Sequence, residues 1–187
     1  MTETTDKTVE SDLSSAAIEA FVLQWGDLGS QWGVNRSVSQ IHAFLYLQNE
    51  PVTADRIAEE FGMARSNVSN SLKELLSWKL IRRVPIKGDR RDHFAAETDV
   101  WEIAQRIAEG RKTREIDPAL ETLRRCVEEA EDDPAVNDVQ RERLIAMRDF
   151  MENVDRWYSQ MVALPVGKRE ALLKLGAKVA RFLPERK

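Results

Sequence analysis

The sequence predicts a mainly α-helical protein that contains one small β element of two or three strands. Apolar residues recur at spacings of three and four over most of the 187 residues, as they do on one face of a helix. Residues 81–86 instead alternate between apolar and polar side chains, as in a strand. Charged residues make up 32% and hydrophobic residues 42% of the chain, which is typical of a helix-rich globular protein with its own core.

The chain begins with a polar, mostly acidic segment over residues 1–12, whose lack of an apolar period predicts a mobile tail. Residues 13–36 carry a helical pattern with most apolar positions on one face. Gly26 and Gly29 either weaken this helix or let another helix approach it closely. A second helix is predicted over residues 37–48.

Two further helices are predicted on either side of Gly62. Thr53 can accept an orphan backbone N–H and cap the first of them, and Gly62 suits the left-handed residue that ends it. The second helix is predicted over residues 64–78. The side chains on its inner, core-facing side are Val68, Leu72, Leu75 and Leu76. Its outward face consists of Arg65, Ser66, Asn67, Ser69, Asn70 and Lys73. Ser and Asn are poor helix formers that bond well to base edges and phosphates, so this face predicts contact with nucleic acid.

A basic hairpin follows. Residues 81–86 form its first strand, Lys87-Gly88-Asp89 supply the turn, and residues 93–97 return as the second strand. A helix, a tight turn, a polar-faced helix and a hairpin together predict a winged helix-turn-helix over residues 37–98, which has a shape that fits DNA.

The remainder of the chain, residues 99–187, is predicted to be helical. Asp99 caps a first helix, and Pro118 interrupts the pattern before a second helix begins. After a break at residues 132–134, a long helix is expected over residues 138–163, and a last amphipathic helix over residues 168–182.

The charge is distributed unevenly. The net charge of the chain is −4. Residues 62–91, which we name the basic window, hold eight bases and two acids and so have a net charge of +6. The rest of the chain therefore has a net charge of −10. Phosphate attraction is local and is screened beyond about 10 Å, so the charge of the window matters more than the charge of the chain. A basic face on an acidic body favours oriented DNA binding.

Other function classes find little support in the sequence. One cysteine, Cys126, and two histidines exclude an internal disulfide and a zinc site built from Cys and His; Cys126 is either a plain thiol or a redox sensor. The phosphate-loop, dinucleotide-binding and nucleophile-elbow motifs are absent, so we expect neither an enzyme nor a cofactor. No apolar run reaches about 18 residues and no signal core begins the chain, so no membrane span and a cytoplasmic location are expected.

These motifs resemble the MarR family of winged helix-turn-helix transcription factors, and within it the GbsR-like branch. The resemblance rests on the segments Arg65-Ser-Asn-Val-Ser-Asn-Ser-Leu-Lys-Glu-Leu75, Trp78-Lys-Leu-Ile-Arg-Arg-Val84 and Gly88-Asp-Arg-Arg-Asp-His-Phe94. It implies a homodimer in which residues 13–36 and 99–187 supply the dimerisation helices. It also implies that each recognition helix enters a major groove and each wing a minor groove. Ala64 departs from the pattern, because such proteins often have a Ser cap there.

Carried over residue by residue, the resemblance makes the outward residues of helix 64–78 the recognition face, Arg91 the wing-tip arginine and Asp89 the acid that braces it. Arg or Lys can bond guanine O6 and N7, and Asn can bond adenine N6 and N7. Arg90 and Arg91 are expected to reach a narrow, A·T-rich minor groove. Phosphate contacts, which position a protein without reading sequence, are expected from Arg82, Arg83 and Lys87.

An effector site is a further hypothesis. GbsR-like relatives suggest a quaternary-ammonium osmolyte, and such cations bind in aromatic cages through cation–π attraction. The candidate residues are Trp25, Trp32, Trp157 and Tyr158. The simpler explanation for Trp25 and Trp32 is the core of a dimer, because both lie on the apolar stripe of the first helix.

The sequence therefore predicts a homodimeric, sequence-specific DNA-binding regulator of transcription that acts on a pseudo-palindromic site. Repression is favoured over activation, and a small molecule is expected to release the DNA. The alternative is a winged helix that docks a protein partner and binds no DNA. The net charge of the basic window and the polar recognition face favour DNA.

Overall fold

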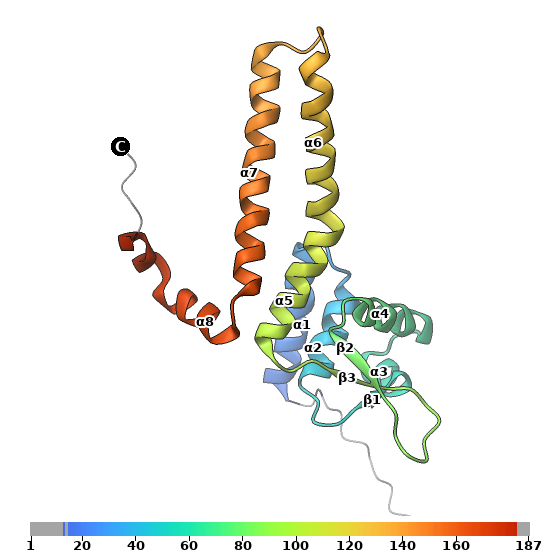
Figure 1. Cartoon of the computed structure of the whole chain (residues 1–187). Coiled ribbons are helices and arrows are strands. Elements are labelled where there is room, and N and C mark those ends of the chain that lie inside the picture. Colours follow the sequence, from blue (N-terminus) through green and yellow to red (C-terminus); the bar gives the residue numbers. More distant parts are fainter. Residues whose placement is uncertain (1–12, 14, 183–187) are drawn as a thin grey trace, which may run out of the picture. The chain divides into compact units, whose positions relative to one another are not determined.

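The computed structural model describes residue 13 and residues 15–182, so the acidic segment over residues 1–12 lies outside the described part. The chain forms two compact units that divide after Arg106. The predicted fold class is confirmed: helices dominate the described residues, accompanied by one three-stranded antiparallel sheet (Figure 1).

The first unit contains the helix-turn-helix and the sheet. Its elements are α1 (Ala16–Gln31), α2 (Arg36–Tyr46), β1 (Val52–Thr53), α3 (Ala54–Phe61), α4 (Arg65–Ser77), β2 (Ile81–Val84), β3 (His93–Ala96) and the start of α5 (Val100–Arg111). The strands lie in the order β1-β3-β2, with Ile81 opposite Ala96. The strand β1 was not predicted from the sequence, because two residues are too few to show an alternating pattern.

The core of this unit lies where α2 packs against α4. Phe44 and Ile41 of α2 are fully buried, as are Ile57 of α3 and Val68 of α4. Phe44 also meets Phe61 edge to face, with ring centroids 5.5 Å apart. The inner face of α4 is therefore fixed by apolar contacts, which leaves its other face outside the core.

Two glycines of α1 allow α2 to approach closely. A Cβ atom at Gly29 would lie 1.9 Å from Ser39 Oγ, and one at Gly26 would lie 2.5 Å from Gln40 Cγ. The second of the two explanations for these glycines is thus confirmed. The apolar face predicted for this helix splits in two, because Val22 points into the core whereas Trp25, Leu28 and Trp32 stay exposed. We name these three exposed residues the α1 stripe.

The turn of the helix-turn-helix follows the local sequence signals. The Thr53 hydroxyl accepts the backbone N–H of Arg56 at 3.2 Å and caps α3. Gly62 ends α3 with φ of 59°, the left-handed conformation that was predicted for it. Ala64 occupies the N-cap position of α4, where its side chain can form no hydrogen bond. The end of α3 is therefore set by Gly62, whereas the start of α4 has no side-chain cap.

The second unit continues from α5 into a helical hairpin. It contains a π-helical turn (Lys112–Ile116), α6 (Asp117–Asp132), α7 (Asp138–Ala163), α8 (Val166–Leu175) and a 3₁₀ turn (Gly176–Phe182). Figure 1 shows α6 and α7 side by side as an antiparallel pair. The long helix predicted over residues 138–163 is confirmed, and a capping box between Asn137 and Gln140 begins it.

Two expectations for this unit need correction. Pro118 does not separate two helices by a loop, because it lies in the first turn of α6, where its missing N–H costs little, and a π-helical turn joins it to α5. The helix expected over residues 168–182 ends at Leu175, since Gly176 takes a positive φ of 51° and the chain continues as a 3₁₀ turn.

One apolar face of α7 is left uncovered by the other described residues of its unit. Leu120, Val127 and Ala130 of α6 are buried in the hairpin, and Arg124 of α6 bonds Glu152 of α7 at 2.9 Å. Four other α7 side chains, spaced three and four apart, are between 42% and 65% exposed. We name them the α7 seam: Met147, Phe150, Val154 and Trp157. No helix among the described residues is long and apolar enough to cross a membrane.

We expect Gly29→Ala to lower the free energy of unfolding by about 1–3 kcal/mol, because the new methyl group forces α1 and α2 apart. The gain in helix propensity, about 1 kcal/mol, offsets only part of this loss. Urea denaturation at one protein concentration measures the change. Gln24→Ala, at an exposed position of the same helix, is the control. A Gly29→Ala variant as stable as wild type would contradict the close approach.

His42 predicts an acid-sensitive fold. Burial lowers the pKa of His42 from its ordinary value of 6.5 to about 4, because the charged imidazolium is poorly solvated in the core. Between these values the unfolded chain binds more protons than the folded chain. Stability is therefore lost as the pH falls below about 6.5, reaching about 3 kcal/mol near pH 4.

The measurement compares unfolding free energies of wild type and His42→Phe from pH 7 to pH 4. We expect the wild type to lose more stability than the variant over this range. NMR titration of the His42 ring in the wild type gives a second reading that does not depend on the variant folding. A ring that titrates near pH 6.5 would show this explanation to be wrong.

Candidate nucleic-acid interface

The outward face of α4 is where the sequence placed it. All six predicted recognition residues, Arg65, Ser66, Asn67, Ser69, Asn70 and Lys73, are exposed. Val68, Leu72 and Leu75 are buried as predicted, whereas Leu76 is only half-buried. Arg65 pairs with Asp55 of α3 at 3.1 Å, and both side chains are largely exposed. An exposed ion pair of this kind contributes little, so a phosphate can compete for Arg65.

Asn67, one residue of this face, is contacted by a side chain of α2. Oδ1 of Asn67 lies 3.2 Å from the Oγ of Ser37, at the beginning of α2. Ser37 Oγ in turn contacts Asn35 Oδ1 at 2.8 Å and Ser71 Oγ at 3.2 Å. Asn70, one helical turn further along, has no side-chain hydrogen bond to any described residue. The two asparagines therefore differ in freedom although they share a face.

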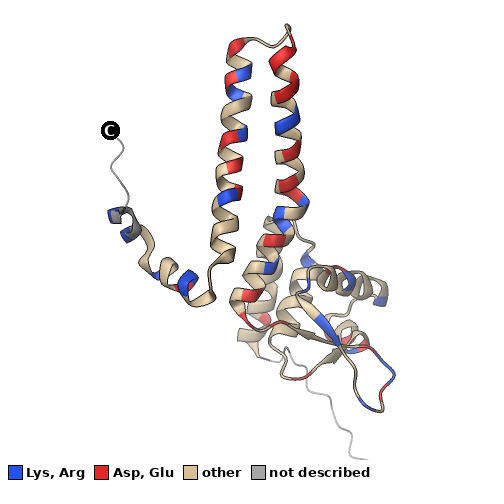
Figure 2. Cartoon of the chain, viewed as in Figure 1, with Lys and Arg blue, Asp and Glu red and all other residues tan. Residues whose placement is uncertain are grey.

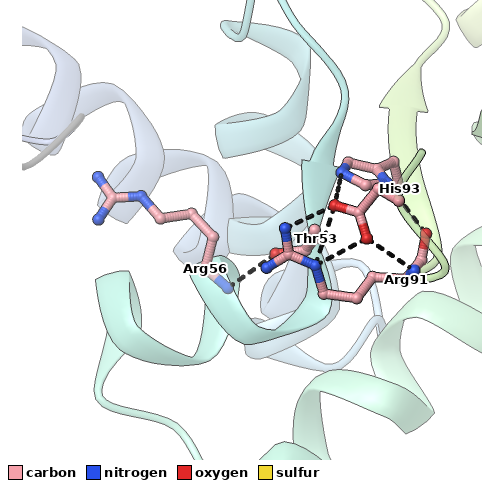
Figure 3. A network of polar contacts seen from close by, with 5 residues as sticks. Thr53, Arg56, Arg91 and His93 are labelled. Atoms are coloured by element: carbon pink, nitrogen blue, oxygen red, sulfur yellow. Dashed lines mark hydrogen bonds and ion pairs between the residues drawn. The ribbon is translucent and has the colours of Figure 1, made fainter. Parts of the chain in front are cut away.

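The wing is organised around Asp89. Arg91 donates its backbone N–H to Asp89 Oδ1 at 2.9 Å, and its Nε lies 3.0 Å from both carboxylate oxygens. His93 closes the cluster with Nε2 3.5 Å from Asp89 Oδ2 and with Nδ1 3.0 Å from the Arg91 carbonyl oxygen. Figure 3 shows Arg91 and His93 turned toward this one carboxylate. The bracing contact that the resemblance implied is thus present.

Hydrogen bonds from Arg91 determine the charge of this cluster. They hold the pKa of Asp89 well below its usual range and raise the pKa of Arg91. Both groups therefore stay charged at any pH near neutrality. Gly88, at φ of 87°, makes the sharp turn that brings Asp89 back toward Arg91.

A groove separates α4 from the wing. Its polar lining includes Ser69 and Lys73 of α4, and Arg83, Arg91 and Asp92 of the wing. Arg83 lies 3.7 Å from Asp92. Arg82, although also exposed, is its neighbour on β2 and points to the opposite face of the sheet. Only Arg83 of this predicted pair therefore lines the groove beside α4.

The remaining basic residues of the wing are exposed. Lys87 and Arg90 form no ion pair with any residue that the structure describes. Figure 2 shows Lys and Arg along the hairpin of the first unit, whereas α6 and α7 carry acidic and basic side chains interspersed. The basic window is thus a feature of the folded surface as well as of the sequence.

Residues 32–92 match the sequence model of the MarR family, and this span contains α2, β1, α3, α4, β2 and the wing tip. This winged helix belongs to the MarR family.

Curated relatives of this MarR-family segment come from Bacillus subtilis. The HTH-type transcriptional repressor GbsR is 29% identical over 70 residues, which are 37% of this chain and 38% of GbsR. The putative HTH-type transcriptional regulator YvaV is 25% identical over 71 residues, or 38% of this chain and 40% of YvaV. The chain thus matches about two fifths of the length of these relatives.

A solved structure extends the likeness in fold beyond the MarR-family segment. The crystal structure of a transcriptional regulator superposes with a TM-score of 0.60 at 18% identity, and covers 77% of this chain and 94% of its own. At this identity the superposition supports the fold and carries no residue roles.

The aromatic residues considered for an effector lie in both units. Trp25 and Trp32 belong to the exposed α1 stripe of the first unit, where Trp25 stacks on Phe21 at 5.6 Å. In the second unit Trp157 is exposed, whereas the neighbouring Tyr158 turns its hydroxyl into the protein. Trp157 and Tyr158 therefore do not share a face of α7.

The side chains that support this MarR-family surface were not predicted from the sequence. Ser37 and Ser71 lie behind Asn67, and His93 lies under Arg91. One signal was available: Ser71 falls among Val68, Leu72 and Leu75 on the buried side of α4, where a polar residue needs a partner. Nothing in the sequence indicated that Ser37, more than 30 residues away, is that partner.

Proposed function

We propose that this chain is a sequence-specific DNA-binding regulator of transcription. The observation that carries the proposal is the pairing of an exposed Arg/Ser/Asn face on α4 with a basic wing on the same MarR-family unit. Such a face offers donors and acceptors for base edges, and the wing offers cations for phosphates and the minor groove. The match to GbsR, a transcriptional repressor, favours repression.

The proposed complex would contain two kinds of contact, one with base edges and one with phosphates. α4 would enter the major groove and read bases with Asn67, Asn70 and Lys73, while Arg91 would reach a narrow minor groove. Arg65, Arg82, Arg83, Lys87 and Arg90 would serve mainly as phosphate contacts that fix the orientation. So concentrated a positive charge favours a phosphate backbone over a neutral protein partner.

We also propose that two copies of the chain associate, because two apolar surfaces lie uncovered. The α1 stripe and the α7 seam expose seven large apolar or aromatic residues that a monomer would normally bury. A two-fold dimer would place two α4 helices about one DNA turn apart and so favour a pseudo-palindromic site. This assigns Trp25 and Trp32 to the dimer rather than to an effector cage.

DNA binding is tested with duplexes selected from random sequence, titrated from 50 to 200 mM salt. We expect a linear fall of log K with log [salt], because released counterions drive part of the binding. Asn67→Ala and Asn70→Ala should lose about 1–3 kcal/mol of discrimination at individual base pairs. Arg91→Ala should weaken binding to all sequences.

Lys168→Ala is the matched control, since it removes an exposed positive charge of α8 outside the basic window. Affinity that does not depend on sequence, or that is unchanged in all three interface variants, would overturn the proposal. Binding of a protein partner by a chain with no affinity for duplex DNA would support the alternative function.

Association is tested by sedimentation of Phe150→Glu and Trp157→Glu. We expect both variants to shift from dimer to monomer, because a charge on the α7 seam is costly to bury in an interface. Ser159→Glu adds the same charge to an exposed position on another side of α7 and should stay dimeric. Dimers of unchanged strength in both seam variants would exclude this surface.

A further inference from the structure

The inference concerns how Asn67 is oriented, and it rests on the proposed DNA binding. Asn67 is exposed on α4, yet both ends of its amide already face protein atoms. Oδ1 lies 3.2 Å from Ser37 Oγ, and Nδ2 lies 3.9 Å from the sulfur of Met63. An exposed asparagine normally rotates freely, so these contacts restrict a side chain that would otherwise sample several rotamers.

Ser37 is well placed to hold another group because it is itself buried and hydrogen-bonded. Its side chain is buried, with 8% of the residue exposed. Its backbone N–H donates to Asn35 Oδ1 at 2.9 Å, the capping bond of α2, and its hydroxyl reaches the same oxygen at 2.8 Å. Ser71 Oγ lies 3.2 Å away on the other side. The hydroxyl is thus fixed by α2 and by α4 together.

The hydrogen-bond inventory defines what Asn67 can offer to DNA. The single Ser37 hydroxyl proton is shared between Asn35 Oδ1 and Asn67 Oδ1, and Ser71 can donate to the Ser37 oxygen. With Oδ1 turned toward Ser37, one N–H of the Asn67 amide is directed at Met63 and the other remains for a base. Asn67 therefore presents a donor in a fixed direction.

Asn70 provides the contrast within the same helix. Its amide is exposed and has no hydrogen bond to the described residues, so it can turn to use both its oxygen and its nitrogen. An asparagine of this kind suits the two-bond contact with adenine N6 and N7. The restrained Asn67 suits a base that presents an acceptor instead.

We propose that Ser37 is a positioning residue that determines sequence specificity through Asn67. It does not touch DNA; it holds the Asn67 amide so that one base pair of the site is read in one way. Loss of the Ser37 hydroxyl frees Asn67 to rotate, and the chain then accepts other bases at that pair. Contacts made by Asn70 and by the wing are left as they were.

The experiment compares selected-site profiles of wild type, Ser37→Ala, Asn67→Ala and Asn70→Ala in the full chain. We expect Ser37→Ala to lower discrimination by about fivefold, the worth of one ordinary hydrogen bond, at the base pair that Asn67→Ala also affects. The positions that depend on Asn70 and the salt dependence of binding should not change. Ser37→Thr, which keeps the hydroxyl, should restore the wild-type profile.

Ser39→Ala is the matched control. Ser39 is buried on the same helix but faces Gly29 of α1, so its loss perturbs α2 without reaching α4. Thermal unfolding of each variant establishes that it folds. A change of profile in Ser39→Ala equal to that in Ser37→Ala would assign the effect to general loosening of α2 and overturn the proposal.

A reading without DNA comes from the side-chain amide of Asn67 in ¹⁵N-labelled protein. In the wild type we expect the chemical shifts of its two protons to differ from those of a free asparagine and their exchange with solvent to be slow. In Ser37→Ala we expect both to move toward the values of a free asparagine. Unchanged signals, or an unchanged profile in Ser37→Ala while Asn67→Ala alters it, would overturn the positioning role. A wild-type chain without sequence-preferring DNA binding would instead remove the proposed function, and this role with it.

Discussion

The arrangement of the first unit depends on the burial of α2 against neighbours on two sides. Nine consecutive residues of this helix, Ser37 to Leu45, are buried, which is unusual because four of the nine have polar side chains. One side accepts α1 through the two glycines, and the other accepts the inner face of α4 through Phe44, Ile41 and their neighbours. Because α2 packs against both helices, it sets the positions of α1 and α4 together.

Local chemistry made much of this fold predictable from the sequence. Thr53, Gly62, Gly88 and Asp99 act on the backbone within a few residues of themselves, and each is found in the role expected from its type. The inner and outer faces of α4 also followed, because a helix with a regular apolar period has only one way to lie on a core. The least predictable features were those that depend on distant partners. The glycines of α1 permitted two explanations until Ser39 and Gln40 were seen opposite them.

The candidate interface shows the same division. Exposure of the recognition residues could be predicted from the period of α4, and the Asp89–Arg91 contact from the resemblance to a family. The difference between Asn67 and Asn70 could not, because it arises from a serine 30 residues earlier in the chain. The predicted strand already placed Arg82 and Arg83 on opposite faces, but only the structure showed that Arg83 is the one beside α4.

The wing carboxylate has a further consequence for selectivity. Asp89 occupies the guanidinium of Arg91 before any ligand arrives, and so acts as an internal competitor for it. In the proposed complex, Arg91 would exchange this carboxylate for the groove, or share itself between the two. Only a groove with strongly negative potential would make that exchange favourable. Asp89 would thereby also set the minimum negative potential that a surface needs in order to bind Arg91. Weakly anionic surfaces would not reach it.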